Sequence, residues 1–264
     1  MDYQLAGRVA LVNAGSRGLG RGIAEALAAE GARLVISSRD ATAIIQAARE
    51  ISAAHHTDVV PVAADVSTPA AASDLVAAAT GHFGALDILV TNSGGPPGGT
   101  FTDFTDEDWQ HAFDLLLLSV VRMVRAALPH LRASGRGRII NVASSAVREP
   151  IPGLILSNSL RAAVAGLAKT LADELAPDQI TVHTVLPGRI LTDRLRGPFI
   201  EPARAAGMDV DDLARAEVAK EVPLGRVGEP ADLGNLVAFL CSAGAAYLTG
   251  LTVAVDGGRL RAIF

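Results

Sequence analysis

The sequence of 264 residues contains one cysteine, Cys241, so a disulfide within the chain and a cysteine-based metal site are both excluded. A small, buried apolar side chain is the expected role of Cys241. The His, Asp and Glu residues show no metal-ligand spacing either, and no metal site is expected.

Positive charge is also scarce, because Lys and Arg number 23 against 28 Asp and Glu, a formal net charge of −5. Nucleic-acid binding needs a basic face, so nucleic acid is not an expected partner. The sequence has neither a leader pattern nor an uninterrupted run of 18 apolar residues. We therefore expect no membrane association and a cytoplasmic location.

Apolar sequence is abundant: hydrophobic residues make up 50% of the chain and charged residues only 19%, which favours a sizeable core and self-association. Short runs rich in Val and Ile alternate with Ala-rich stretches of helical spacing, a pattern typical of parallel β-α units. Strands are predicted near residues 8–13, 33–37, 58–63, 87–92, 138–143, 181–186 and 252–256. Helices are predicted near residues 19–30, 41–54, 70–81, 106–133, 157–176 and 229–242.

These elements predict one α/β domain over residues 1–264, a Rossmann-type, doubly wound parallel sheet of seven strands in a three-layer α/β/α arrangement. The alternation breaks only between residues 188 and 228, where three prolines and a mixed-charge stretch show no strand pattern. Ligands of open α/β sheets bind beyond the carboxyl ends of the strands, so the insertion 189–228 is expected to form a lid over the substrate. A surface excursion or an oligomer contact is the alternative.

A glycine-rich turn follows the first predicted strand and leads at once into a predicted helix. Its residues are Gly15, Ser16, Arg17, Gly18, Leu19 and Gly20, with the glycines in the pattern G-x-x-G-x-G. Small residues let the backbone approach a pyrophosphate, whose charge is stabilised by the free N–H groups and the positive end of the helix. The turn therefore predicts a nucleotide site.

The end of the second strand distinguishes the two nicotinamide dinucleotides, because an acidic residue there binds the ribose 2′-hydroxyl group of NAD(H). Here the position carries Ser38, followed by Arg39, and Arg17 lies in the glycine-rich turn. A hydroxyl and two guanidinium groups can form a phosphate pocket, so NADP(H) is the predicted cofactor. Asp65 and Val66, after the third strand, either bracket the adenine or form a turn.

Further stretches, TNSGG (91–95), IINVASS (139–145), LPGRILT (186–192) and LTGLTVAVDGG (248–258), resemble those of the short-chain dehydrogenase/reductase family, near its 3-oxoacyl-(acyl-carrier-protein) reductase-like members. The resemblance runs the full length of the chain. It implies an NADP(H)-dependent oxidoreductase that acts on a small-molecule carbonyl or secondary alcohol as a homotetramer or homodimer. It also implies cofactor contacts from Asn92, Ser93, Gly94, Arg161, Pro187, Gly188, Ile190 and Thr192.

The proton-transfer residues of that family are largely replaced. Ser144 keeps the family's serine, whereas Ser157 and Arg161 occupy the positions of its Tyr-x-x-x-Lys pair and Leu116 that of an asparagine. The chain has two tyrosines and two lysines, and no tyrosine has a lysine four positions after it. The usual proton donor of the family is therefore excluded, and the resemblance is to a divergent subgroup.

A phenol beside a lysine cation can protonate the oxygen of a carbonyl that receives a hydride, whereas a serine hydroxyl is a much weaker acid. Ser157 and Arg161 are one helical turn apart, so with Ser144 they are the predicted catalytic residues, acting by polarising the carbonyl. A catalytically impaired NADP(H)-binding protein with a sensing or assembly role is the alternative, and lyase or isomerase chemistry stays open. A surface ion is favoured over an acid role for Glu149, and buried packing over catalysis for His183.

Overall fold

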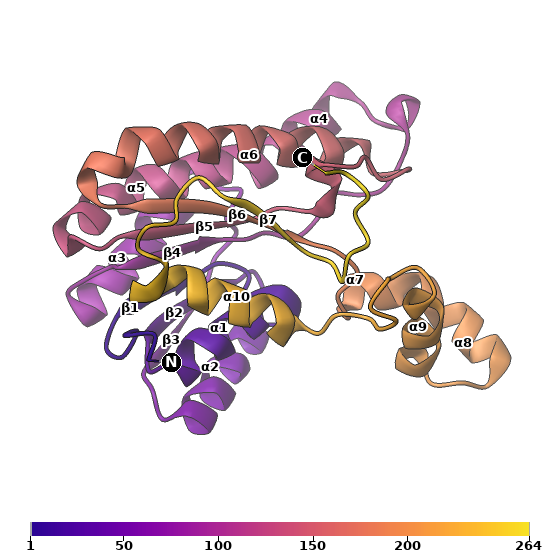
Figure 1. The fold of residues 1–264 in the computed structure, drawn as a ribbon, viewed down its shortest axis with the longest axis horizontal. Helices are drawn as coiled ribbons and strands as arrows, with labels where there is room; N and C mark the ends of the chain where they lie inside the picture. The colour runs from indigo at the N-terminus through magenta and orange to yellow at the C-terminus, as the bar shows by residue number, and fades with distance from the viewer. Residues whose placement is uncertain (1, 264) are drawn as a thin grey trace.

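The computed structural model describes residues 2–263, which form one sheet of seven parallel strands in the order β3-β2-β1-β4-β5-β6-β7 (Figure 1). The strands are β1 (Val9–Val12), β2 (Arg33–Ser38), β3 (Val59–Ala63), β4 (Ile88–Thr91), β5 (Arg138–Val142), β6 (Thr181–Pro187) and β7 (Thr252–Val255). The predicted seven-stranded, doubly wound α/β fold is confirmed, and each strand end lies within one residue of its predicted position.

Helices cover both faces of the sheet (Figure 1). One layer holds α1 (Gly18–Ala29), α2 (Ala41–His55) and α10 (Pro230–Cys241), and the other holds α3 (Ala71–Phe83), α5 (Ser119–Ser134) and α6 (Ile155–Leu175). Strand β1 shows why both layers form, because Ala10 and Val12 pack into the first layer, and Val9 and Leu11 into the second. No helix among residues 2–263 combines the length and the apolar composition that a membrane span needs.

The helix predicted over residues 106–133 is present over residues 106–134, but it is not α-helical throughout. The structure divides it into α4 (Asp106–Phe113), a π-helical turn (Asp114–Leu118) and α5. A π turn needs neither glycine nor proline, so the leucine run at residues 115–118 gives no sign of a break in the sequence. The turn directs Leu116 into the core, where it is 3% exposed.

Helix α6 begins at Ile155, two residues before its predicted start, so Ser157 lies in its first turn. This places Ser157 and Arg161 on consecutive turns at the end of α6 that faces the carboxyl edge of the sheet.

Residues 189–228 form a lobe beyond the carboxyl end of β6 (Figure 1). The lobe contains α7 (Asp193–Arg196), α8 (Ile200–Ala206) and α9 (Val210–Ala219). It has a small apolar core of its own, made by Leu191, Ala214, Val218, Val222 and Val227. The insertion is thus a helical element with its own packing, and its action as a lid stays a prediction.

Candidate active site

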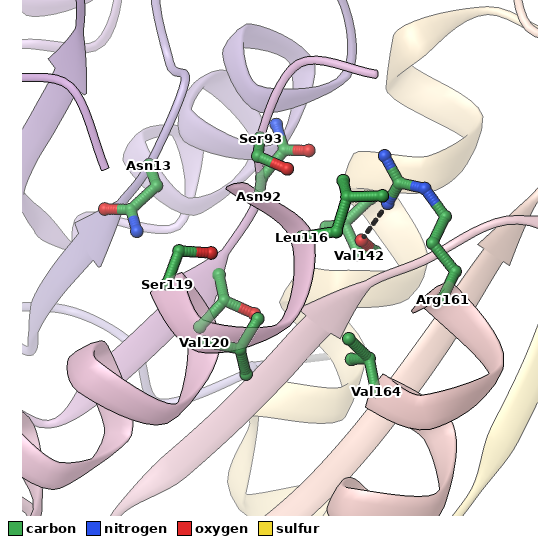
Figure 2. A pocket seen from close by; sticks show the side chains of 10 residues that line it. Asn13, Asn92, Ser93, Leu116, Ser119, Val120, Val142, Arg161 and Val164 are labelled. Atoms are coloured by element: carbon green, nitrogen blue, oxygen red, sulfur yellow. Dashed lines mark hydrogen bonds between the residues drawn. The ribbon is translucent and has the colours of Figure 1, made fainter. Parts of the chain in front are cut away.

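A pocket lies at the carboxyl edge of the sheet, where the segments after β1, β4 and β5 meet the π turn, α5 and α6 (Figure 2). The side chains that line it are Asn13, Thr91, Asn92, Ser93, Leu116, Ser119, Val120, Val142, Arg161 and Val164. Arg161 is the one charged side chain among these ten. The pocket therefore offers a positive charge and no acid.

The glycine-rich turn beside this pocket is tightly built. The backbone N–H of Gly15 donates to the carbonyl oxygen of Ser37 at 2.8 Å, and a Cβ atom at Gly20 would collide with the carbonyl oxygen of Ala14. Helix α1 begins directly after Arg17 with no side-chain cap and no acidic residue in its first turn. Its first N–H groups are therefore open to an anion, and the turn fits the pyrophosphate of a dinucleotide.

Ser38 ends β2 and Arg39 follows it, with the carboxylate of Asp65 close enough for the charge of Arg39 to act on it. The hydroxyl of Ser38 donates to the backbone oxygen of Asp40 at 2.9 Å, while the Asp40 carboxylate caps α2. Arg17 pairs instead with Asp193 of α7 at 3.2 Å, and both side chains are exposed. Ser38 and Arg39 thus share one strand end, whereas the place of Arg17 in a phosphate pocket stays a prediction.

Asp65 closes a turn after β3, because its carboxylate accepts hydrogen bonds from the backbone N–H and the hydroxyl of Ser67 at 3.0 and 2.8 Å. Burial raises the pKa of Asp65, but the bonds from Ser67 and the charge of Arg39 outweigh it and hold that pKa below its ordinary value. Val66 is half-buried against the core. The turn interpretation is what these bonds support, and an adenine contact stays a prediction.

The loop after β4 brings Asn92, Ser93 and Gly94 to the same edge. Asn92 and Ser93 line the pocket, and Nδ2 of Asn92 lies 2.9 Å from where a Cβ atom at Gly20 would stand. The loop after β4 and the glycine-rich turn are therefore in direct contact.

The segment after β6 reaches the glycine-rich turn from the other side. Pro187 ends β6, and the N–H of Gly188 donates to the carbonyl oxygen of Val255 at 2.9 Å. Ile190 forms a parallel bridge with Gly228 that closes the base of the insertion. Thr192 then lies over Gly18, with its methyl carbon 3.3 Å from the position of a Cβ atom there. The predicted cofactor residues of β6 and of the turn thus meet.

The two predicted catalytic serines flank Arg161. The hydroxyl oxygen of Ser144, at the end of β5, accepts from the N–H of Ala146 at 3.1 Å, which leaves its own O–H free to donate. Ser157, in the first turn of α6, is 5% exposed. The short turn Ser145–Val147 packs against α6, so the segments that carry the two serines are neighbours, but neither serine is among the ten residues that line the pocket, and their catalytic role stays a prediction.

Arg161 extends from α6 to the end of β5 (Figure 2). Its Nη1 donates to the carbonyl oxygens of Val142 at 3.0 Å and Ala143 at 3.2 Å. Burial lowers the pKa of Arg161 to about 10, with the positive charge of Arg194 acting in the same direction, so Arg161 is a cation at neutral pH. Its Nε and Nη2 atoms form no hydrogen bond among residues 2–263, which leaves them free for a ligand.

Arg194, an exposed residue whose charge acts on Arg161, is a neighbour of the candidate site that the sequence did not reveal. Helix α7 carries it to the loop after β4, where its Nη2 donates to the carbonyl oxygen of Pro96 at 3.3 Å and its guanidinium packs directly on Gly95. No local motif marks Arg194, because its place depends on the packing of the insertion against a loop about 100 residues earlier.

The tyrosines and Lys169 lie at the opposite, amino edge of the sheet. Tyr3 packs against Phe239 with the ring centroids 6.2 Å apart. Tyr247 is fully exposed, and it lies two residues before Thr249, whose hydroxyl oxygen accepts a hydrogen bond from Val182 near the start of β6. Nζ of Lys169 lies beside Gly250, whose N–H donates to Val182 near the start of β6. The other lysine pairs with a glutamate within the insertion. No distant tyrosine or lysine in the described chain therefore replaces the missing pair.

The structure bears on His183 and Glu149 in different ways, since burial fits the packing role favoured for His183, whereas the surface-ion role favoured for Glu149 stays a prediction. His183 is fully buried in β6, and burial, followed by the charge of Arg138, lowers its pKa to about 4. Glu149 is exposed. The buried Cys241 fits its predicted packing role.

Comparison with known proteins gives a consistent result. The family model described as Enoyl-(Acyl carrier protein) reductase matches residues 13–259. The chain is 37% identical over 259 residues to human dehydrogenase/reductase SDR family member 4, covering 96% of this chain and 88% of that protein. It is 34% identical over 255 residues to a 3-oxoacyl-[acyl-carrier-protein] reductase of Vibrio cholerae, covering 96% and 98%. Among solved structures, L-sorbose reductase from Gluconobacter frateurii, complexed with NADPH and L-sorbose, has a TM-score of 0.94 at 36% identity, covering 100% of both chains.

Proposed function

The chain belongs to the short-chain dehydrogenase/reductase family, and from this we propose that it is an NADP(H)-dependent oxidoreductase that interconverts a carbonyl group and a secondary alcohol. One observation carries the proposal: helix α1 begins without a cap after the glycine-rich turn, next to a pocket whose one charged lining residue is Arg161. The first feature suits a dinucleotide pyrophosphate, and the second suits an oxygen that gains negative charge.

The cofactor is NADP(H). Ser38 and Arg39 stand where an acidic residue would bind the 2′-hydroxyl group of NAD(H), and L-sorbose reductase, a structural relative, binds NADPH. The bare first turn of α1 would hold the pyrophosphate, and the segment from Pro187 to Thr192, which contacts the glycine-rich turn, would lie next to it. When bound, the dinucleotide supplies a hydride to the carbonyl carbon or accepts one from the alcohol.

Arg161 holds the substrate oxygen. Because its Nη1 is fixed by the carbonyl oxygens of Val142 and Ala143, Nε and Nη2 are left to donate to a ligand. Together with the O–H groups of Ser144 and Ser157, these donors stabilise the negative charge that develops on the oxygen. Neither serine nor arginine is a good acid near neutral pH, so water provides the proton of the product alcohol.

A catalytically impaired NADP(H)-binding protein is the second candidate. It is favoured by the same set of replacements, since the loss of a positioned acid costs on the order of 100- to 10,000-fold in rate. A protein of this kind would bind the dinucleotide and use the bound state for sensing or assembly.

The experiment that separates these candidates has two parts. NADPH binding is measured by calorimetry, and a panel of ketones, aldehydes and secondary alcohols is assayed at the nicotinamide absorbance. Turnover with any member supports the oxidoreductase. Tight NADPH binding without turnover supports the second candidate, and a folded protein that does not bind NADPH contradicts both.

Two structural roles complete the proposal. Residues 189–228 act as a lid, supported by the contact of Thr192 with Gly18 and by the ion pair between Arg17 and Asp193. The chain forms a homo-oligomer through α4 and α6, supported by an open groove between them that is lined by Trp109, Phe113 and Leu160. Light scattering of the purified protein tests the assembly.

A further inference from the structure

Two arginines at the candidate site, Arg161 and Arg194, have no carboxylate partner among residues 2–263. We refer to them as the arginine pair. They come from unrelated parts of the chain, Arg161 from α6 and Arg194 from α7. Both bind only backbone carbonyl oxygens, so neither charge is offset by an ion pair; Arg161 is partly buried, and Arg194 is exposed.

The insertion makes the isolation of Arg194 unusual. It contains seven basic residues, and six of them pair with a carboxylate, namely Arg189, Arg196, Arg204, Arg215, Lys220 and Arg226. The same segment contains seven acidic residues, so acids are available. Arg194 is thus the exception in a segment whose other cations are neutralised.

The loop after β4 joins the two members of the pair. Arg161 lines the pocket together with Asn92 and Ser93, and Arg194 packs on Gly95 and bonds to Pro96. Gly95 permits this approach because a Cβ atom there would overlap the guanidinium of Arg194. Burial is the main cause of the lowered pKa of Arg161, and the positive charge of Arg194 acts in the same direction, so the two cations are close enough to repel each other. This repulsion has no offset within the described chain, and an anionic ligand between the two groups would remove it.

We propose that the arginine pair binds a carboxylate group of the substrate, so that the enzyme acts on oxo acids or hydroxy acids rather than on neutral carbonyl compounds. The proposal rests on the proposed oxidoreductase function. The planar fork of a guanidinium matches a carboxylate with two parallel hydrogen bonds, and a carboxylate close to the carbonyl group reaches both arginines. The dinucleotide pyrophosphate is the other anion at this edge, and the test separates the two sources.

The test compares the wild type with Arg194→Gln and with the control Arg204→Gln, a lid arginine that pairs with Glu201 at the surface. Each protein is assayed with NADPH and a set of 2-oxo and 3-oxo acids against their methyl esters. We expect Arg194→Gln to raise KM for the acids about 10- to 100-fold, with little effect on the esters. NADPH affinity is expected to stay unchanged in Arg194→Gln. Arg194→Lys, which keeps the charge, should raise KM for the acids less than Arg194→Gln does, and Arg204→Gln should have the same KM as the wild type.

Equal use of acids and esters by the wild type would overturn the carboxylate site while leaving the oxidoreductase in place. If Arg194→Gln weakened NADPH binding by as much as it raised KM for the acids, Arg194 would belong to the pyrophosphate site, and this result would also overturn the carboxylate site. If no carbonyl compound is reduced, acetoacetate is titrated into the NADPH-loaded protein by calorimetry. Binding that Arg194→Gln weakens would support the arginine pair even though the oxidoreductase proposal fails, and absence of binding would overturn it.

Discussion

The two edges of the sheet use arginines in different ways: Arg8 and Arg138 at the amino edge are buried, whereas at the carboxyl edge Arg161 is partly buried and Arg194 is exposed. At the amino edge, Arg8 donates to the backbone oxygens of Cys241 and Arg136, both at 2.7 Å, and Arg138 donates to Gly137 at 2.9 Å. The carboxylate of Asp87 lies among them. At the carboxyl edge, Arg161 and Arg194 bind backbone oxygens too, but neither forms an ion pair with a carboxylate among residues 2–263.

This difference separates structural charge from functional charge. Asp87 accepts hydrogen bonds from the N–H of Val9 at 2.8 Å and the hydroxyl of Ser134 at 2.6 Å, so its carboxylate is held by protein groups at the amino edge, although Nε of Arg8 and Nε of Arg138 have no partner there. Burial raises the pKa of Asp87, but these bonds and the charge of Arg8 hold it below its ordinary value. Arg161 and Arg194 have no such counter-charge among residues 2–263, and Nε and Nη2 of Arg161 are open to a ligand. Changes at the amino edge should therefore alter stability, and changes at the carboxyl edge should alter activity.

The largest expected effect is a loss of stability when Asp87 is replaced at the amino edge. Asp87→Ala removes the acceptor of Val9 and Ser134 and leaves the charge of Arg8 without an acid, so we expect a loss of about 3 kcal/mol or more in the free energy of unfolding. Urea denaturation followed by circular dichroism measures it. Asp178→Ala, which removes an exposed partner of Arg132, is the control and should cost less than about 1 kcal/mol. Equal losses in the two variants would contradict the network.

Acid should weaken the protein through His183. Its ordinary pKa of 6.5 applies in the unfolded chain, whereas burial lowers the value to about 4 in the folded state. The contribution of neutral His183 is complete above pH 6.5 and is lost as the pH falls toward 4, because the unfolded chain then binds the extra proton. We expect the free energy of unfolding to decrease by on the order of 2 to 3 kcal/mol as the pH falls through this range.

Unfolding free energies at several pH values measure this slope. His183→Leu keeps an apolar side chain in β6 and should flatten it, while His82→Leu, near the end of α3, should not. A slope that persists in His183→Leu would assign the acid sensitivity to other groups.

Restoring a proton donor at the carboxyl edge tests whether changes at this edge alter activity. Ser157→Tyr with Arg161→Lys reintroduces a phenol one helical turn before a lysine cation, and we expect ketone reduction to rise at least about tenfold. Steady-state kinetics measures kcat, and Arg161→Lys alone is the control. Ser157 is buried, so circular dichroism must first show that the double variant folds. Unchanged activity in a folded double variant would mean that the missing acid does not limit the rate.

The smallest expected effect concerns the glycine-rich turn. Ala14 has a φ of 53°, in the left-handed region where a Cβ atom is crowded by the backbone. Ala14→Gly relieves that crowding, and we expect about 1 kcal/mol of added stability. Thermal unfolding measures it. Ala53→Gly, on the exposed face of α2, should have the opposite sign because glycine is unfavourable in a helix.

Much of the fold could be predicted because its signals are local. Strands buried on both faces require near-continuous apolar runs, as in β1 and β4, and the strand ends followed from those runs to within one residue. The glycine-rich turn could be identified because its spacing depends on the backbone of adjacent residues alone. The π turn at residues 114–118 could not, since its leucines suit an uninterrupted helix equally well.

The sequence by itself determined that the family's Tyr-x-x-x-Lys pair is absent, because a motif within one helical turn either exists in the sequence or does not. Only the tertiary structure decided that Tyr3, Tyr247 and Lys169 lie at the far edge, where they cannot serve the site. It also decided that Arg194 stands near Arg161, since that approach depends on the packing of the insertion against the loop after β4. The spacing of residues within one helical turn can be read from the sequence. Arg161 and Arg194 are 33 positions apart, so their charges come near each other only when the elements that carry them pack together.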